Sequence, residues 1–431
     1  VTRTTLNTTG TGTKTLYGIY YTGATPVNNF IGNTVDSITR NGTSGGTTIG
    51  IYQVGGTNGT STTTVRRNKI SNFSITGTGT GSTMYGIQVS TGTIIVDSNE
   101  IFNLNIAKTT ASGALYGIYD ISSPTNEQFN VNRVYNLNNI GTGLVYGIYA
   151  FTTTGVRTVA GNTIYNLTGN STTIGILMTS SSPTITRNKL YSISTLGTNG
   201  MAVGIRISSV GTSGFSNVAY NLISGLSSPF YSGASDGIRG IDLTTTTATS
   251  SSNVYYNTIY LDANQSGANF SSSGLFFTTN ATSTTATLNL RNNIIINNSV
   301  PAGTGVSSAL RFSSATNSNY GSLSNNNLFY AGPISNNNLL YFDGTNRDST
   351  LTQFKNRLAP REGSSLRESI TFQNIHPDSS NYLIPAPLVP TQLESGATAI
   401  SGFTGDYASI TSRASFPLSG QVNGGGSAPD I

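Results

Sequence analysis

The feature that most constrains the fold is a short phrase, aromatic-Gly-Ile-aromatic, that returns about every 30 residues. Its first copy is Tyr17-Gly18-Ile19-Tyr20. A repeat of roughly 20 to 50 residues predicts a solenoid, in which each repeat packs only on its neighbours. The later copies are Ile49-Gly50-Ile51-Tyr52, Tyr85-Gly86-Ile87, Tyr116-Gly117-Ile118-Tyr119, Tyr146-Gly147-Ile148-Tyr149, Ile174-Gly175-Ile176 and Val203-Gly204-Ile205.

The second half of each repeat reads Asn-x-aliphatic, and its ten copies lie 26 to 36 residues apart. The variable lengths fall in stretches rich in Gly, Thr and Ser, which form turns. Constant strands joined by variable turns are typical of a coil whose cross-section is kept from turn to turn. We expect the asparagines to stack in a ladder, each amide donating to the carbonyl of the next turn. They are Asn33, Asn68, Asn99, Asn132, Asn162, Asn188, Asn221, Asn257, Asn292 and Asn326.

Strand alternation predicts which residues face the core, because successive side chains point to opposite faces. On this rule the isoleucine of each phrase and the residue two places before it both point inward. The predicted inner column is Ile19, Ile51, Ile87, Ile118, Ile148, Ile176 and Ile205, continued by Ile241, Leu275, Leu310 and Leu340. Its inner neighbours are Tyr17, Ile49, Tyr85, Tyr116, Tyr146, Ile174 and Val203.

These patterns predict an all-β chain folded as a parallel β-helix of about ten to eleven turns. The repeat resembles that of the right-handed, pectate-lyase-like β-helix proteins over about residues 15 to 345. The resemblance implies a right-handed coil formed by a single strand of chain. We place the boundary of the β-helix at residues 1–345 and a C-terminal capping segment at 346–431.

Composition narrows the functional classes. Only 9% of residues are charged and the net charge is +5, with the basic residues scattered singly along the chain. A nucleic-acid-binding protein gathers its basic residues on one face, so we expect no nucleic-acid partner. The chain has no cysteine, which excludes disulfides and thiolate chemistry. No apolar run reaches the roughly 18 residues of a membrane helix, so no span is expected in this segment.

The chain changes character after residue 345. Prolines cluster there, seven of the sixteen acidic residues lie there, and so does the only histidine, His376. Such a segment is expected to cap the last turn, which otherwise presents an open sheet edge.

The same segment resembles the C-terminal end of β-helix proteins secreted by Bacteroidetes. The matching phrases are Phe372-Gln373-Asn374-Ile375, then Gly405-Asp406-Tyr407 with Arg413, and the terminal Ala428-Pro429-Asp430-Ile431. The resemblance implies export, commonly by the type IX secretion system, with a sorting domain beyond Ile431. The chain also starts at Val1 without a methionine, so we expect it to be a processed form or an excised segment.

The acidic residues are too sparse for an obvious catalytic site. A Ca²⁺-dependent lyase needs several carboxylates together, yet no acid occurs between Glu127 and Asp236. An inverting glycoside hydrolase needs two carboxylates roughly 6.5–9.5 Å apart. The weak alternative is therefore a polysaccharide lyase or hydrolase that uses Asp236, Asp242 and Asp262. We expect no metal and no cofactor.

The residue after each inner isoleucine should face outward. Where it is aromatic it offers an apolar ring with a polar tip, suited to glycans or to another surface protein. The candidate ligand-binding residues are Tyr20, Tyr52, Tyr119 and Tyr149. The other predicted outward positions are Gln88, Leu177, Arg206, Asp242, Phe276, Arg311 and Tyr341. The leading hypothesis is an extracellular bacterial surface protein, an adhesin or structural stalk without catalytic activity.

Overall fold

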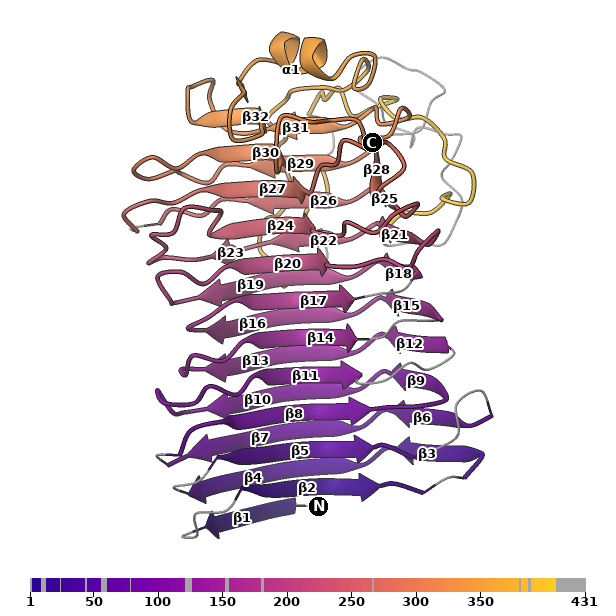
Figure 1. Ribbon diagram of the computed structural model, residues 1–431, viewed down its shortest axis with the longest axis vertical. Coiled ribbons are helices and arrows are strands. Elements are labelled where there is room, and N and C mark those ends of the chain that lie inside the picture. The colour runs from indigo at the N-terminus through magenta and orange to yellow at the C-terminus, as the bar shows by residue number, and fades with distance from the viewer. Residues whose placement is uncertain are drawn as a thin grey trace.

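The computed structural model describes residues 2–8, 13–23, 25–42, 45–55, 60–77, 79–120, 126–151, 155–179, 182–265, 267–379, 381–386 and 389–407. It is an elongated solenoid with three long sheets, A, B and C, that run along its axis (Figure 1). All pairings between strands of these sheets are parallel except the short pairing of β32 with β33. The parallel β-helix predicted from the repeat is confirmed.

The strands are assigned to the sheets as follows. Sheet A contains β1 (Thr2–Thr8), β4 (Thr34–Gly42), β7 (Lys69–Thr76), β10 (Glu100–Ile106), β13 (Arg133–Asn139), β16 (Thr163–Gly169), β19 (Lys189–Thr195), β22 (Leu222–Ser224), β26 (Thr258–Leu261), β29 (Ile294–Asn297) and β31 (Leu328–Tyr330), with β23 (Leu226–Ser227) beside β19. Sheet B contains β2 (Lys14–Tyr21), β5 (Gly46–Gln53), β8 (Ser82–Val89), β11 (Leu115–Asp120), β14 (Val145–Phe151), β17 (Thr173–Thr179), β20 (Ala202–Ile207), β24 (Ile238–Leu243), β27 (Ser272–Phe277), β30 (Ser307–Phe312), β32 (Asn338–Phe342) and β33 (Arg347–Asp348). Sheet C contains β3 (Val27–Ile31), β6 (Thr62–Arg66), β9 (Thr93–Asp97), β12 (Asn126–Asn130), β15 (Val156–Ala160), β18 (Ser182–Thr186), β21 (Phe215–Ala219), β25 (Ser251–Tyr255) and β28 (Thr287–Arg291).

Each turn of the coil passes through sheets C, A and B in that order. In Figure 1 the chain runs to the right along sheet B in front and returns to the left along sheet A behind, rising with each turn, so the coil is right-handed. The nine strands of sheet C mark nine complete turns. Sheets A and B each continue beyond them at both ends, with β1, β2, β31 and β32, so the expected ten to eleven turns include these partial ones.

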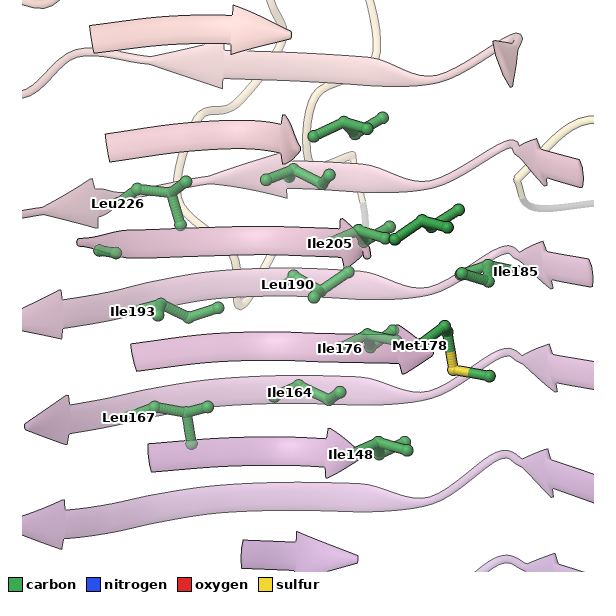
Figure 2. Packing of buried hydrophobic residues seen from close by; sticks show 14 of the residues in the cluster. Ile148, Ile164, Leu167, Ile176, Met178, Ile185, Leu190, Ile193, Ile205 and Leu226 are labelled. Carbon is green, nitrogen blue, oxygen red and sulfur yellow. The ribbon is translucent and has the colours of Figure 1, made fainter. Parts of the chain in front are cut away.

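The core lies between the three sheets and is built from columns of aliphatic side chains. The isoleucines of the repeated phrase pair in register from strand to strand of sheet B. From Ile51 to Ile205 they are fully buried, and Ile19 in the first turn is half-buried. Figure 2 shows Ile148 and Ile176 on sheet B beside Ile164 on sheet A.

The last turn departs from the prediction by one residue. Leu310 pairs with Tyr341, not with Leu340, and Arg311 pairs with Phe342. Leu340 therefore stands in line with Ala309 and with the glycines of earlier copies, and Tyr341 is a fully buried member of the inner column, not an outward residue. The prediction was wrong here because the two adjacent leucines, Leu339 and Leu340, leave the register of this copy ambiguous, and only the pairing with β30 decides it.

The asparagine column forms a continuous side-chain ladder at the corner between sheets C and A. Each asparagine donates from its backbone N and its Nδ2 to the Oδ1 of the next, as Asn132 does to Asn162 at 2.9 and 3.0 Å. From Asn68 onward the Nδ2 also donates to a sheet C carbonyl, for Asn132 that of Val96 at 2.9 Å. Linked in this way are Asn33, Asn68, Asn99, Asn132, Asn162, Asn188, Asn221, Asn257, Asn293 and Asn327.

For two asparagines of the ladder, the predicted position was wrong by one residue. Asn257 donates to Asn293, so Asn292 and Asn326 precede the ladder positions. Both have positive φ, 56° and 59°, a conformation that asparagine tolerates better than most residues. Their side chains bond to the C-terminal segment instead, each contacting Thr398.

The C-terminal segment closes the last turn. Helix α1 (Leu351–Leu358) is capped at its N-terminus by Thr350, whose hydroxyl accepts from the Gln353 backbone N. Its buried residues Phe354 and Leu358 belong to the main core. The asparagine ladder ends in the buried carboxyl of Glu362, to which Asn327 Nδ2 donates at 3.1 Å. The capping segment at 346–431 stays a prediction, and Arg413 and residues 428–431 lie outside the described residues.

Beyond the helix the chain runs back along the outside of sheet A and its corner with sheet C. Tyr382 contacts the Tyr191 ring, Phe372 contacts Tyr260, and the Arg187 Nε donates to the Asp406 carbonyl. In Figure 1 this segment lies on the side of sheet A and away from the front of sheet B. Across the described ranges, no helix is long and apolar enough to cross a membrane.

Candidate functional site

The outer face of sheet B carries two parallel columns of tyrosines. One column follows the inner isoleucines, as predicted, with Tyr20, Tyr52, Tyr119 and Tyr149. The other consists of the residues before each glycine, which alternation had placed inside. The structure corrects that prediction, because Tyr146, Ile174 and Val203 form an apolar cluster with Leu177 and Tyr149 that is separate from the core.

The glycine of the phrase is the reason for this error. The residue before each tyrosine, such as Met84 or Leu115, belongs to the core, and so does the isoleucine after each glycine. Alternation is therefore broken at the glycine. A Cβ atom on Gly86 would lie 2.5 Å from Ile101 Cγ2 of sheet A, so the glycine faces inward where the two sheets approach closely. The tyrosine before it is consequently turned to the outer surface.

We call the eight tyrosines on this surface the tyrosine face: Tyr17, Tyr20, Tyr52, Tyr85, Tyr116, Tyr119, Tyr146 and Tyr149. Their rings stack along the solenoid axis because parallel strands repeat at about 4.8 Å. Tyr85 and Tyr116 have ring centroids 4.8 Å apart and planes at 8°, and Tyr116 and Tyr146 are 5.0 Å apart. The two columns also touch, with 4.6 Å between Tyr116 and Tyr119.

Burial differs along the tyrosine face. Tyr20 in the first turn is 55% exposed, whereas Tyr146 is only 6% exposed. Burial raises the pKa of Tyr85 and of Tyr146 to about 12, so both hydroxyls stay protonated at neutral pH. No described segment crosses in front of β2 to β17 in Figure 1. The face is therefore uncharged and partly exposed, with its ring faces largely turned to one another.

Further along sheet B the outward positions become charged. Asp236 and Asp242 lie on either side of Arg239, whose Nε and Nη1 donate to them at 2.9 Å each. Arg206 also pairs with Asp242 at 2.5 Å, and Arg311 pairs with Asp236. Both carboxylates are fully buried, so they are neutralised by arginines and closed to solvent.

The third residue of the catalytic alternative lies elsewhere. Asp262 follows β26 of sheet A, whereas Asp236 and Asp242 belong to the sheet B side. The structure thus brings two of the three candidate acids together and leaves the third apart. A role for the three in catalysis stays a prediction.

Three acidic residues nearer the start of the solenoid also form ion pairs with arginines. Asp97 pairs with Arg66 at 2.7 Å, and Glu100 pairs with Arg133 at 3.1 Å. Glu127 forms an ion pair with Arg157 that is entirely buried. Within the part of the chain that the structure describes, no three His, Cys, Asp or Glu residues are grouped so that they could hold a metal ion.

Sequence reasoning missed a second aromatic column, on the outer face of sheet A. Phe102, Tyr135, Tyr165 and Tyr191 stack at 4.7 to 4.9 Å with planes within 9° of one another. Their common position, three residues after the ladder asparagine, is the signal that could have identified them. The C-terminal segment contacts the last of them, Tyr191, through Tyr382.

Comparison with known proteins gives no further constraint. No protein family, curated protein or solved structure was found to match this chain.

Proposed function

We propose that this chain is an exported bacterial surface protein, an adhesin whose tyrosine face binds neutral glycans without catalysing their cleavage. The observation that carries the proposal is the tyrosine face itself, in which eight tyrosines line the outer face of five consecutive sheet B strands. Tyrosine offers a large contact area at a small loss of side-chain entropy, and it is enriched at binding hot spots.

The chemistry of the face indicates the class of partner. Its rings stack on one another, so a partner meets ring edges and hydroxyl groups in rows that follow the solenoid axis. A tyrosine hydroxyl both donates and accepts hydrogen bonds. Apart from Lys14 at the start of β2, the strands β2, β5 and β8 carry no charged residue. A hydroxyl-rich, uncharged polymer lying along the axis is complementary to such a surface.

The state of the acids supports binding rather than catalysis. A general acid or base has to reach the bond it acts on, whereas the buried carboxylates Asp236 and Asp242 are held by arginines. Export by the type IX system is supported by the resemblance of the C-terminal phrases alone, and it forms part of the same proposal.

The binding proposal is tested with neutral and acidic polysaccharides. The full chain should be retained on insoluble neutral glycans in pull-down assays, and less on pectin or alginate. The double variant Tyr116→Ser with Tyr149→Ser should weaken retention at least about tenfold, because it removes one ring from each column. The matched control is Tyr165→Ser, which removes a stacked ring from sheet A and should leave retention unchanged.

The same samples test the absence of catalysis. Each polysaccharide is incubated with the protein, with and without Ca²⁺, and assayed for reducing ends and unsaturated products. Release of either product would refute a purely binding function. Equal retention of the wild type and the double variant would instead refute the role of the tyrosine face.

A further inference from the structure

The first turns of the solenoid bury two cations close to each other. Arg40 on β4 is 1% exposed, and Lys108, in the turn after β10, is 3% exposed. Both lie where sheet A passes into sheet B. Lys108 Nζ donates to the buried Ser82 hydroxyl at 3.1 Å, and Ser82 pairs in register with Gly46, beside which the Arg40 guanidinium lies.

The hydrogen bonds of Arg40 are incomplete. Its Nη2 donates to the Gly45 carbonyl at 2.6 Å, but its Nη1 is buried and has no hydrogen-bond partner in the structure. Asn139, which occupies the same column of sheet A further along, is satisfied by contrast. It donates to the Gly113 and Gly143 carbonyls and accepts from the Gly141 backbone N. This column of sheet A can therefore hold a polar side chain whose hydrogen bonds are all made. The unpaired donor is a feature of Arg40 and not of the position.

Within the described part of the chain, no ion pair joins Arg40 or Lys108 to an acidic residue. The sequence contains no Asp or Glu before Asp36, none between Asp36 and Asp97, and none between Glu100 and Asp120. The turns that meet at Arg40 and Lys108 all lie within these acid-free stretches. Asp36, the nearest acid in sequence to Arg40, accepts hydrogen bonds from Ser37 and Asn72 on the outer face of sheet A.

Burying like charges without a counter-ion is strongly unfavourable, because each loses its hydration and repels the other. Burial lowers the pKa of Lys108, and the charge of Arg40 lowers it further. Burial also lowers the pKa of Arg40, although a guanidinium keeps its proton in proteins. A charged group with an unused donor therefore remains in the core even when Lys108 is neutral.

We propose that a small inorganic anion of the size of chloride binds between Arg40 and Lys108 and locks the first turns of the solenoid. Arg40 Nη1 and Lys108 Nζ donate to it, and the Ser82 hydroxyl lies beside it. The enclosed position favours a monovalent ion that is easily dehydrated over a large or multivalent one. This site lies at the sheet A to sheet B corner and is independent of the tyrosine face.

The proposal is tested by thermal unfolding of the full chain at pH 7 and fixed ionic strength, with sodium gluconate replaced stepwise by sodium chloride or bromide. A ligand that binds only the folded state raises the unfolding midpoint with the logarithm of its concentration. We expect a rise of a few degrees in the wild type and none in Arg40→Met or Lys108→Met. The matched control is Lys69→Met, which removes an exposed lysine from sheet A and should keep the full rise.

Chloride-35 NMR gives a direct readout. The wild type should broaden the chloride line, bromide should reverse the broadening, and Lys108→Met should broaden it much less. If Arg40→Met does not fold, Lys108→Met and the NMR titration still decide the question. An equal response of the midpoint to chloride in the wild type and Lys108→Met, or no chloride effect in the wild type, would overturn the proposal.

Discussion

Removing a side-chain amide from the middle of the buried asparagine ladder should destabilise the fold far more than removing a half-buried amide that lies outside the ladder. The Asn162 side chain accepts from the Asn132 backbone N and Nδ2, and it donates to the Phe129 carbonyl at 2.7 Å and to Asn188 Oδ1 at 2.8 Å. Asn162→Ala leaves two buried N–H groups of Asn132 and the Phe129 carbonyl without these partners.

The expected loss of stability follows from the number of buried polar groups that lose a partner. Each buried polar group that loses its partner costs about 1–3 kcal/mol, so three of them give about 3–6 kcal/mol after partial relaxation. Asn138→Ala is the control. Asn138 lies on the neighbouring strand β13, is half-buried, and makes one side-chain hydrogen bond, to Asn105 at 2.8 Å. Its loss should cost about 1 kcal/mol.

The assay combines denaturant unfolding with hydrogen exchange, because a solenoid can open locally. The Asn132 backbone amide should lose protection in Asn162→Ala, whereas amides several turns away should not. Equal destabilisation by the two variants, or unchanged protection at Asn132, would refute the ladder as a source of stability.

A second substitution at the same position tests the polarity of the ladder. Asn162→Asp places an acceptor oxygen where Nδ2 now donates to the Phe129 carbonyl and to Asn188 Oδ1. Burial and these two acceptors should raise the pKa of the introduced carboxyl above its unfolded value of about 3.9. The variant should therefore be closest to wild-type stability at low pH and lose stability as pH rises through the folded pKa.

Three further predictions concern the core, the glycine column and the cap. Ile148→Ala removes a fully buried ladder residue and should cost about 2–5 kcal/mol, whereas Tyr149→Ala on the half-buried tyrosine face should cost less in the same denaturant titration; equal losses would contradict the inside–outside assignment. Gly117→Ala would place a Cβ atom 2.4 Å from Val134 Cγ1 and should lower the free energy of unfolding by about 1–3 kcal/mol. Gly211→Ala, whose Cβ atom would lie in open space, should leave the free energy of unfolding unchanged. Burial raises the pKa of Glu362, so the stability that its protonated form contributes is full below the unfolded pKa and is lost as pH rises through the folded pKa. Glu362→Gln should flatten this fall of unfolding free energy with pH. An unchanged pH profile of stability in the variant would contradict the prediction.

Much of the architecture could be predicted from the repeat because it reflects local patterning. Aliphatic residues at the Ile118 and Ile148 positions, asparagines such as Asn99 and variable turns between them all favour a parallel β-helix. Each turn packs on a near copy of itself, so one residue type at one position is selected in the same way many times. The sheet B isoleucines and the first eight asparagines of the ladder were therefore placed correctly without knowledge of the tertiary structure.

The errors occurred where the register or the outer packing depends on distant residues. Asn292 and Asn293 both fit the asparagine pattern, and only the pairing with Asn257 distinguishes them. The break in alternation at Gly86 follows from its approach to Ile101 of the opposite sheet, which no local pattern records.

The sequence by itself determined that this chain forms a stack of β-strands with an aliphatic and asparagine-lined interior, because those preferences are encoded in each repeat. Only the tertiary structure decided that both tyrosine columns share the outer face of sheet B. It also decided that Asp236 and Asp242 are held by arginines, and that Arg40 and Lys108 meet inside the coil. These features depend on contacts between turns and between sheets, and their free energies come from burial and electrostatics that arise only after the chain has coiled.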